Sequence, residues 1–302
     1  MSVFEKMVST QAQMFLYLLV GAIISKTGVL KKEGRSSFLQ LLVKVTIPCM
    51  ILHSFEMEIE GDAVMTALLA TAAGIGCSLI GLALGSLFFG RKEPGRRKAL
   101  VFSSMVNNMG NAGLPIVSMV FGSIGVFITS FGLISNIFFM WSIGLMMYAQ
   151  CEKNKMAKTI LTNPNMIAIM LGVVLFTTGL KLPSPVSSAL DRIGAMTAPL
   201  SMMMIGATLA DMRPRDALDR DAFALSAVRL LILPVLFMVI MRLIGLPDVI
   251  WQVITVLFAM PAPTNVAIIA EMYQGDYKFA TKVVFVSTVL SLVTVPCITL
   301  VF

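Results

Sequence analysis

The sequence has few of the residues that build soluble enzymes and metal sites. Only 13% of its 302 residues are charged, and it has one histidine, four cysteines and two tryptophans. The cysteines show no CxxC or Cys-His spacing, so we expect neither a disulfide framework nor a zinc site. HExxH, GxSxG and P-loop motifs are missing too, and the apolar segments hold no paired carboxylates at catalytic spacing. We therefore expect no enzyme, no cofactor and no metal.

Long polar stretches are also missing, the longest being 152–162 and 211–221. The chain is 57% hydrophobic, with a mean hydropathy of +0.89, which is too much apolar surface for one aqueous core. The net charge of +7 would suggest nucleic acid for a soluble protein, but the basic residues stand in short loops between apolar runs. We predict an all-α integral membrane protein that contacts the lipid bilayer and no nucleic acid.

Windows of about 20 residues predict ten membrane spans. They lie near 10–28, 36–55, 63–89, 98–120, 122–149, 164–181, 188–210, 221–244, 248–271 and 277–302. The first apolar run has the length of a signal peptide, but its lysines follow it rather than precede it, and no A-x-A site appears. We interpret it as a retained first span.

The distribution of basic residues predicts the topology. On alternate sides of the ten spans, 17 lysines and arginines fall on one side and 4 on the other. Cytoplasmic loops are the ones enriched in these residues. We therefore expect a multi-pass protein of the cytoplasmic membrane with both termini outside the cytoplasm.

The chain repeats itself at a shift of 151 to 152 residues. Thr46-Ile47-Pro48 corresponds to Thr197-Ala198-Pro199 at this shift, and Phe127 corresponds to Phe279. Five spans per half is an odd number, so the halves 1–150 and 151–302 enter the membrane with opposite orientations. Inverted repeats of this kind are typical of transporters.

Two apolar stretches are built to break a helix. Residues 105–117 read MVNNMGNAGLPIV, and the shift brings residues 107–115 of this stretch onto 258–266, which read FAMPAPTNV. Proline removes a backbone donor and crowds the preceding turn. In a bilayer, unwound backbone is tolerated only where protein or a wet cavity surrounds it. We predict that spans four and nine are broken and cross near the midplane.

With Ile47-Pro48 and Pro199-Leu200, these two motifs resemble the auxin efflux carrier family, which includes bacterial malate- and malonate-carrier-like members. The resemblance covers essentially the whole chain and implies two inverted five-helix repeats, spans two and seven beside the pocket, and a homodimer. It also implies that Asn108, seven residues before Pro115, is the family's carboxylate-binding asparagine. The chain departs from the plant members at Val266, where they have proline, and it lacks an acidic residue in span three. That lack argues against an acid-based support site.

The broken helices predict an anion site. Helix N-termini offer free N–H groups and a partial positive charge, and asparagine adds neutral donors. The predicted substrate-binding residues are Asn107, Asn108, Asn111, Thr264, Asn265 and Ile47. The predicted hinge residues are Gly110, Gly113, Pro115, Pro261, Pro263, Pro48 and Pro199.

We expect a secondary transporter of small organic anions, such as malate, malonate or auxin-like acids, working by alternating access. An anion channel and a membrane-embedded carboxylate sensor are the alternatives, and an asparagine can also simply bond a neighbouring helix for about 0.6–2 kcal/mol.

Three further ionisable residues stand within spans. Lys44 fits either a second anion contact or a side chain that snorkels to the cytoplasm, and Arg229 is expected to snorkel. His53 lies near the outer end of span two beside Glu56 and Glu58, where we favour a solvated or structural histidine over a proton-sensitive group. No pair of acids indicates proton or sodium coupling.

Overall fold

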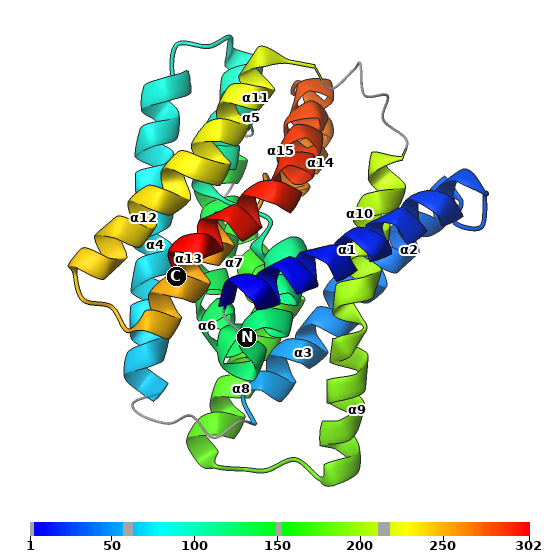
Figure 1. Cartoon of the computed structure of the whole chain (residues 1–302), viewed down its shortest axis with the longest axis vertical. Helices are drawn as coiled ribbons and strands as arrows, with labels where there is room; N and C mark the ends of the chain where they lie inside the picture. The colour runs from blue at the N-terminus through cyan, green and yellow to red at the C-terminus, as the bar shows by residue number, and fades with distance from the viewer. Residues whose placement is uncertain (1–2, 57–62, 149–152, 211–217) are drawn as a thin grey trace.

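The computed structural model describes residues 3–56, 63–148, 153–210 and 218–302, and all regular elements in these ranges are helical. In Figure 1, α4 (Ala63–Phe89) and α12 (Leu233–Leu243) stand on one side, while α1 (Val3–Lys26) and α10 (Thr197–Leu209) stand on the other. The predicted boundary between the halves, at 150/151, lies outside the described residues, as do Glu58, Cys151, Arg213 and Arg215.

Among the described residues, six helical segments are long and apolar enough to cross a membrane. They are Val3–Lys26, Gly34–Ser54, Ala63–Phe89, Met109–Gly144, Arg220–Leu243 and Tyr277–Val301. Two shorter apolar helices, α8 (Pro164–Thr178) and α13 (Asp248–Phe258), accompany them. The prediction of an all-helical, multi-pass membrane protein is confirmed.

Prolines explain where three helices widen into π-turns. The π-segments η1 (Leu42–Thr46), η2 (Met109–Gly113) and η5 (Val228–Ile232) each end two residues before a proline. Proline has no N–H for the carbonyl four residues earlier, and its ring crowds that carbonyl, so the turn opens. At Pro48 the chain stays helical through α2 (Lys32–Leu41), η1 and α3 (Ile47–Ser54). This predicted hinge residue therefore widens its span without breaking it.

Two other positions divide predicted spans. Gly122 has a left-handed φ of 65° inside α6 (Leu114–Phe139), at the junction expected between spans four and five. Span seven is divided at Met196 into α9 (Ser184–Ala195) and α10. The predicted hinge residue Pro199 lies in the first turn of α10, three residues after this division. The other helical elements are α5 (Pro94–Met105), η3 (Met140–Gly144), α7 (Lys153–Leu161), α11 (Arg220–Ala227), α14 (Asn265–Met272), α15 (Tyr277–Ile298) and η6 (Thr299–Val301).

Glycines let helices α1 and α10 touch along their backbones. A Cβ added at Gly21 would lie 2.0 Å from the carbonyl oxygen of Met203, and one at Gly206 would lie 2.0 Å from that of Leu18. Each helix therefore presents a glycine to the backbone of the other. Such small-residue contacts are a common way to pack helices where lipid provides no hydrophobic drive.

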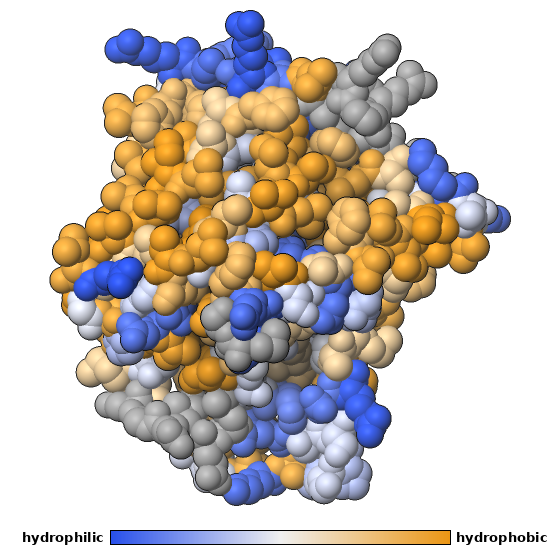
Figure 2. Space-filling view, viewed as in Figure 1, coloured by the Kyte–Doolittle hydropathy of each residue, from blue (hydrophilic) through white to orange (hydrophobic). Residues whose placement is uncertain are grey.

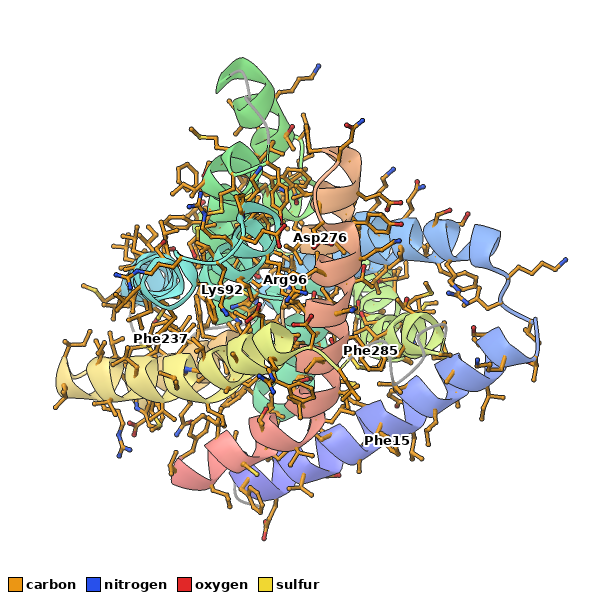
Figure 3. The ribbon with its side chains drawn as sticks, turned by 90° about the horizontal axis from the view of Figure 1, so that it is seen from above. Phe15, Lys92, Arg96, Phe237, Asp276 and Phe285 are labelled. Carbon is orange, nitrogen blue, oxygen red and sulfur yellow. The ribbon has the colours of Figure 1, made fainter. Side chains whose placement is uncertain are left out.

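One end of the molecule carries an ion-pair cluster between the two halves of the chain. Lys92 Nζ lies 2.6 Å from Asp221 Oδ1, and Arg96 pairs with both Asp219 and Asp221 at 3.0 Å. Seen from above in Figure 3, Lys92 and Arg96 lie at the middle of this end, close to Asp276. Figure 2 shows hydrophilic residues gathered at this top end, above a largely hydrophobic face. Three of the loops predicted to be cytoplasmic, those that carry Lys92, Asp219 and Asp276, thus share one end.

Candidate functional site

The structure has a break in each of the two predicted stretches. Helix α5 ends at Met105, and residues 106–108 are not helical before η2 begins at Met109. Helix α13 ends at Phe258, and residues 259–264 are not helical before α14 begins. Proline, glycine and asparagine in these stretches disfavour a continuous helix, as predicted.

The two breaks meet, although about 150 residues separate them in the sequence. The backbone N–H of Asn108 donates to the carbonyl of Pro261 at 3.0 Å. Gly113 makes room for the approach, because a Cβ there would come within 2.9 Å of Leu257 Cδ2 and 3.2 Å of Met260 Cγ. The contact thus ties the N-terminus of η2 to the second break.

A polar side chain from a later helix of the same half supports each break. The Asn136 Nδ2 group donates to the Oδ1 of Asn107 at 2.8 Å and to its backbone carbonyl at 3.2 Å. In the second half, the N–H of Ala262 donates to Ser287 Oγ at 3.1 Å. Asn136 and Ser287 are 151 residues apart, so the two supports correspond at the shift seen in the sequence.

A cavity of about 380 Å³ opens beside the meeting point. Both half-helix N-termini reach it, through Asn108 ahead of η2 and through Thr264 and Asn265 at the start of α14. Among the described residues that line it, none carries a charge. They are Leu39, Leu42, Val43, Asn108, Asn111, Ser201, Met204, Ile205, Thr208, Leu209, Thr264, Asn265, Ala267, Ile268, Thr281, Val284 and Thr288.

Four of the six predicted substrate-binding residues line this cavity, namely Asn108, Asn111, Thr264 and Asn265. Asn107 and Ile47 are buried elsewhere, Asn107 with its side-chain oxygen bonded by Asn136 and Ile47 fully enclosed in the core. Asn107 was predicted for the site because it directly precedes Asn108, and Ile47 because span two was expected beside the pocket. In an unwound or widened helix, however, neighbours in sequence point in different directions.

Two buried donors in the cavity wall have no partner within the described part of the chain. Asn108 is 4% exposed, and its Nδ2 makes no hydrogen bond; the same holds for the Oγ of Ser201, which is 1% exposed. Buried polar groups are nearly always bonded, so such groups in a cavity wall are free for a ligand. Sequence reasoning missed Ser201 because serine in a membrane helix usually bonds its own backbone.

The expectation that Arg229 snorkels is wrong. Its side chain is 0% exposed, and its guanidinium donates to the carbonyls of Ser104 and Met260. Lys44, by contrast, is exposed and bonds Gln40 Oε1 one turn away at 3.1 Å, outside the cavity wall. Of the two interpretations of Lys44, the geometry agrees with snorkelling.

His53 lies on the other side of Pro48 from the cavity, beside a smaller hollow of about 230 Å³. Its Nδ1 is 3.0 Å from Glu56 Oε2, and its Nε2 is 3.6 Å from Asp191 Oδ1 on α9. Glu56 also accepts from the hydroxyl of Ser187. His53 therefore joins α3 to α9 near the surface, which agrees with a structural histidine.

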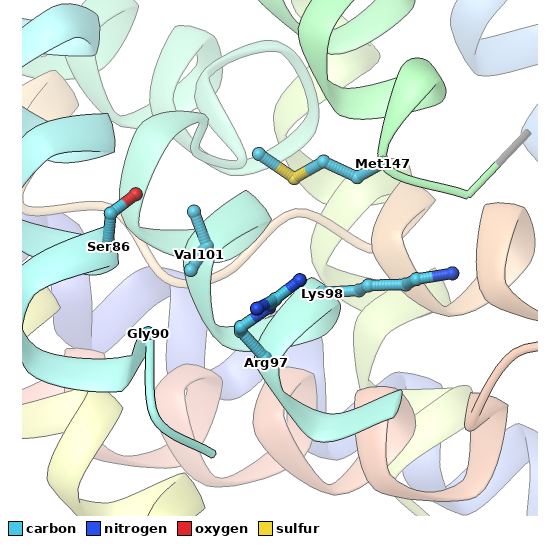
Figure 4. Close-up of a pocket in the computed structure, with 6 residues that line it drawn as sticks. All are labelled: Ser86, Gly90, Arg97, Lys98, Val101 and Met147. Atoms are coloured by element: carbon cyan, nitrogen blue, oxygen red, sulfur yellow. The ribbon is translucent and has the colours of Figure 1, made fainter. Parts of the chain in front are cut away.

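A further hollow, of about 270 Å³, lies at the end of α4 (Figure 4). Arg97 and Lys98 line it, but the Lys98 side chain extends away from Ser86 on the opposite wall (Figure 4). Neither break contributes to its lining. We therefore assign the candidate site to the cavity at the meeting point of the breaks.

Comparison with known proteins agrees with this geometry. The family model described as membrane transport protein matches residues 6–160 and 153–299. The chain belongs to this family. The predicted membership of the auxin efflux carrier family, which this model represents, is thereby confirmed.

Two relatives of this membrane transport protein extend over nearly its whole length. A curated protein of Methanothermobacter thermautotrophicus, named uncharacterized transporter, is 25% identical over 97% of this chain and 98% of its own. A second uncharacterized transporter, from Methanocaldococcus jannaschii, is 23% identical over 93% of this chain and 94% of its own. A Rhizobium meliloti protein named "Putative malonate transporter" is 28% identical over 46% of this chain and 43% of its own.

Proposed function

We propose that this membrane transport protein is a secondary transporter that carries small organic anions across the cytoplasmic membrane by alternating access. The observation that carries the proposal is the cavity at the two breaks. Two half-helix N-termini and the unpartnered Nδ2 of Asn108 converge there without a charged side chain among the described lining residues. Its volume falls in the range of roughly 300–1,000 Å³ that is usual for small-molecule sites.

A carboxylate fits this chemistry best. The N-termini supply about half a positive elementary charge each, and amide and hydroxyl groups add neutral donors. An anion held without a fixed ion pair can be bound and then released. The apolar lining, including Leu42, Ile205 and Ile268, favours acids with a short carbon skeleton over inorganic anions. The relative named as a malonate transporter points to the same substrate class.

Alternating access is supported by the second hollow. At a shift of 151 residues, Ser201 and Ile205 in the cavity wall correspond to Met50 and Ser54 in the wall of the 230 Å³ hollow, and Val43 corresponds to Gly194. The larger cavity and the smaller hollow therefore occupy equivalent places in the two halves. If the two halves of a ten-span inverted repeat exchange their conformations, the smaller hollow opens as the larger cavity closes.

The ten-span arrangement with both termini outside is part of this proposal. The segment Met109–Gly144 would be about 54 Å long as one straight helix, well beyond an apolar core of about 30 Å. With Gly122 as a turn, it supplies the end of span four and all of span five. The homodimer implied by the resemblance stays a prediction.

The test is counterflow in proteoliposomes. Vesicles loaded with unlabelled malonate, malate or indole acetate should accumulate the labelled form of the same acid, with saturable kinetics. Linear, non-saturating flux without counterflow would indicate the channel alternative. Binding of the labelled acid without flux would indicate the sensor.

A further inference from the structure

Arg229 is a cation buried in the middle of an apolar span. It stands ten residues into the segment Arg220–Leu243 and is the largest fully enclosed side chain in the described structure. It belongs to the π-segment η5, whose opened turn follows from Pro234. Charged residues inside membrane spans are rare because they cost free energy, and π-segments often accompany functional sites. Its contacts should therefore matter to function.

The contacts of Arg229 join the two breaks. Its Nη1 donates to the carbonyl of Ser104 at 3.0 Å, next to the last residue of α5. Its Nε donates to the carbonyl of Met260 at 3.2 Å, just after α13. The last carbonyls of a helix lack intrahelical partners and carry a partial negative charge. One guanidinium thus neutralises both C-terminal ends, while the N-termini beyond the breaks face the cavity.

These contacts lie close to Asn108. Met260 directly precedes Pro261, whose carbonyl accepts the N–H of Asn108, and Ser104 lies four residues before Asn108. Asn136 and Ser287 each support a break within their own half. Arg229 donates to a carbonyl in each half, and it does not line the cavity. Its Nε and Nη1 therefore bond backbone, and the donors among the described residues of the cavity wall are all neutral.

Resting on the transport function proposed above, we propose that Arg229 is a positioning residue of the anion site. It holds the C-terminal ends of α5 and α13 together, so that Asn108 and the start of α14 stay aimed into one cavity. Removing its two charge-assisted bonds lets the breaks separate and weakens anion binding without touching the anion.

The first test needs no substrate. In hydrogen exchange on purified protein in nanodiscs, Arg229→Gln should speed exchange in 104–113 and 258–266 by about tenfold or more, the amount expected for losing bonds to a charged group. Arg242→Gln is the matched control, because Arg242 is an exposed arginine of the same span that packs over Trp251. Unchanged protection of both segments in Arg229→Gln would overturn the inference, whatever the protein transports.

The second test separates positioning from folding. In counterflow of labelled malonate, Arg229→Gln should raise KM by about tenfold, and Arg229→Lys should give a smaller rise because a lysine can still reach one carbonyl. A variant that only lost folded protein would lower Vmax in proportion and keep KM, and that result would contradict the inference. If wild-type protein carries no organic anion, the transport proposal fails, and the exchange experiment still decides the role of Arg229.

Discussion

At the scale of single residues, adjacent asparagines have different tasks. Asn107 accepts hydrogen bonds from Asn136 inside the protein, whereas Asn108 lines the cavity and its Nδ2 has no partner among the described residues. The cluster of asparagines predicted a polar site from sequence alone. Which asparagine faces the ligand could not be predicted, because an unwound segment has no periodicity that assigns its side chains to faces.

Asn107→Ala tests the structural role. The substitution removes the side-chain acceptor of a buried amide, so we expect a loss of about 1–3 kcal/mol in stability, measured as a lower midpoint of thermal unfolding in detergent. KM for the anion should change little in the protein that remains folded. An unchanged unfolding midpoint with a raised KM would assign Asn107 to the site instead.

Ser201 and Thr208 form a matched pair on α10, since both line the cavity. The hydroxyl of Ser201 has no partner in the described structure, whereas Thr208 Oγ1 donates to the backbone carbonyl of Met204 at 2.9 Å. Ser201→Ala should therefore raise KM for malonate about five- to tenfold, the equivalent of one neutral hydrogen bond of about 1 kcal/mol. Thr208→Val should leave KM within about twofold. Equal effects of the two changes would show that Ser201 does not contact the anion.

At the scale of helices, the breaks were predictable because proline and glycine act locally. The π-segments before Pro48 and Pro234 were not predicted, since the sequence does not show whether a proline bends, widens or breaks its helix. The division of span seven at Met196 was missed for the same reason. Arg229 was misassigned because its partners are backbone carbonyls of α5 and α13, which no side-chain pattern reveals.

Glycine substitutions test the contact between α1 and α10. Gly206→Ala places a methyl group against the backbone of Leu18, so the helices must separate, at a cost of about 1–3 kcal/mol. Gly76→Ala in α4 meets nothing within 4 Å and should leave stability unchanged or slightly raised. Thermal unfolding of both variants in the same detergent is the measurement. Equal unfolding midpoints for the two would contradict the close packing of these helices.

At the scale of the whole molecule, the repeat relates features that no single motif shows. The shift of 151 residues relates Asn136 to Ser287, and it relates the cavity to the smaller hollow. The ion pairs of Lys92 and Arg96 with Asp219 and Asp221 then link the two halves at one end. These pairings were not visible in the sequence, because charged residues in short loops carry no signal of their partner.

Cysteine labelling tests the ten-span topology. In a background with the four native cysteines replaced by alanine, a membrane-impermeant maleimide added outside intact cells should label Leu180→Cys. Glu271→Cys should react only after the membrane is opened, because the charge distribution predicts that the end of α14 lies in the cytoplasm. Both side chains are exposed in the structure and stand at the ends of their predicted spans. The reverse pattern would invert the topology.

The most direct test of the central claim compares wild-type protein with Asn108→Ala in counterflow of labelled malonate. The substitution removes the free Nδ2 and leaves the backbone bond to Pro261 in place. We predict saturable counterflow by the wild type, and for the variant a value of kcat/KM at least about tenfold lower with an unchanged unfolding midpoint. Wild-type kinetics in Asn108→Ala would contradict the assignment of the anion site to the cavity where the two broken helices meet.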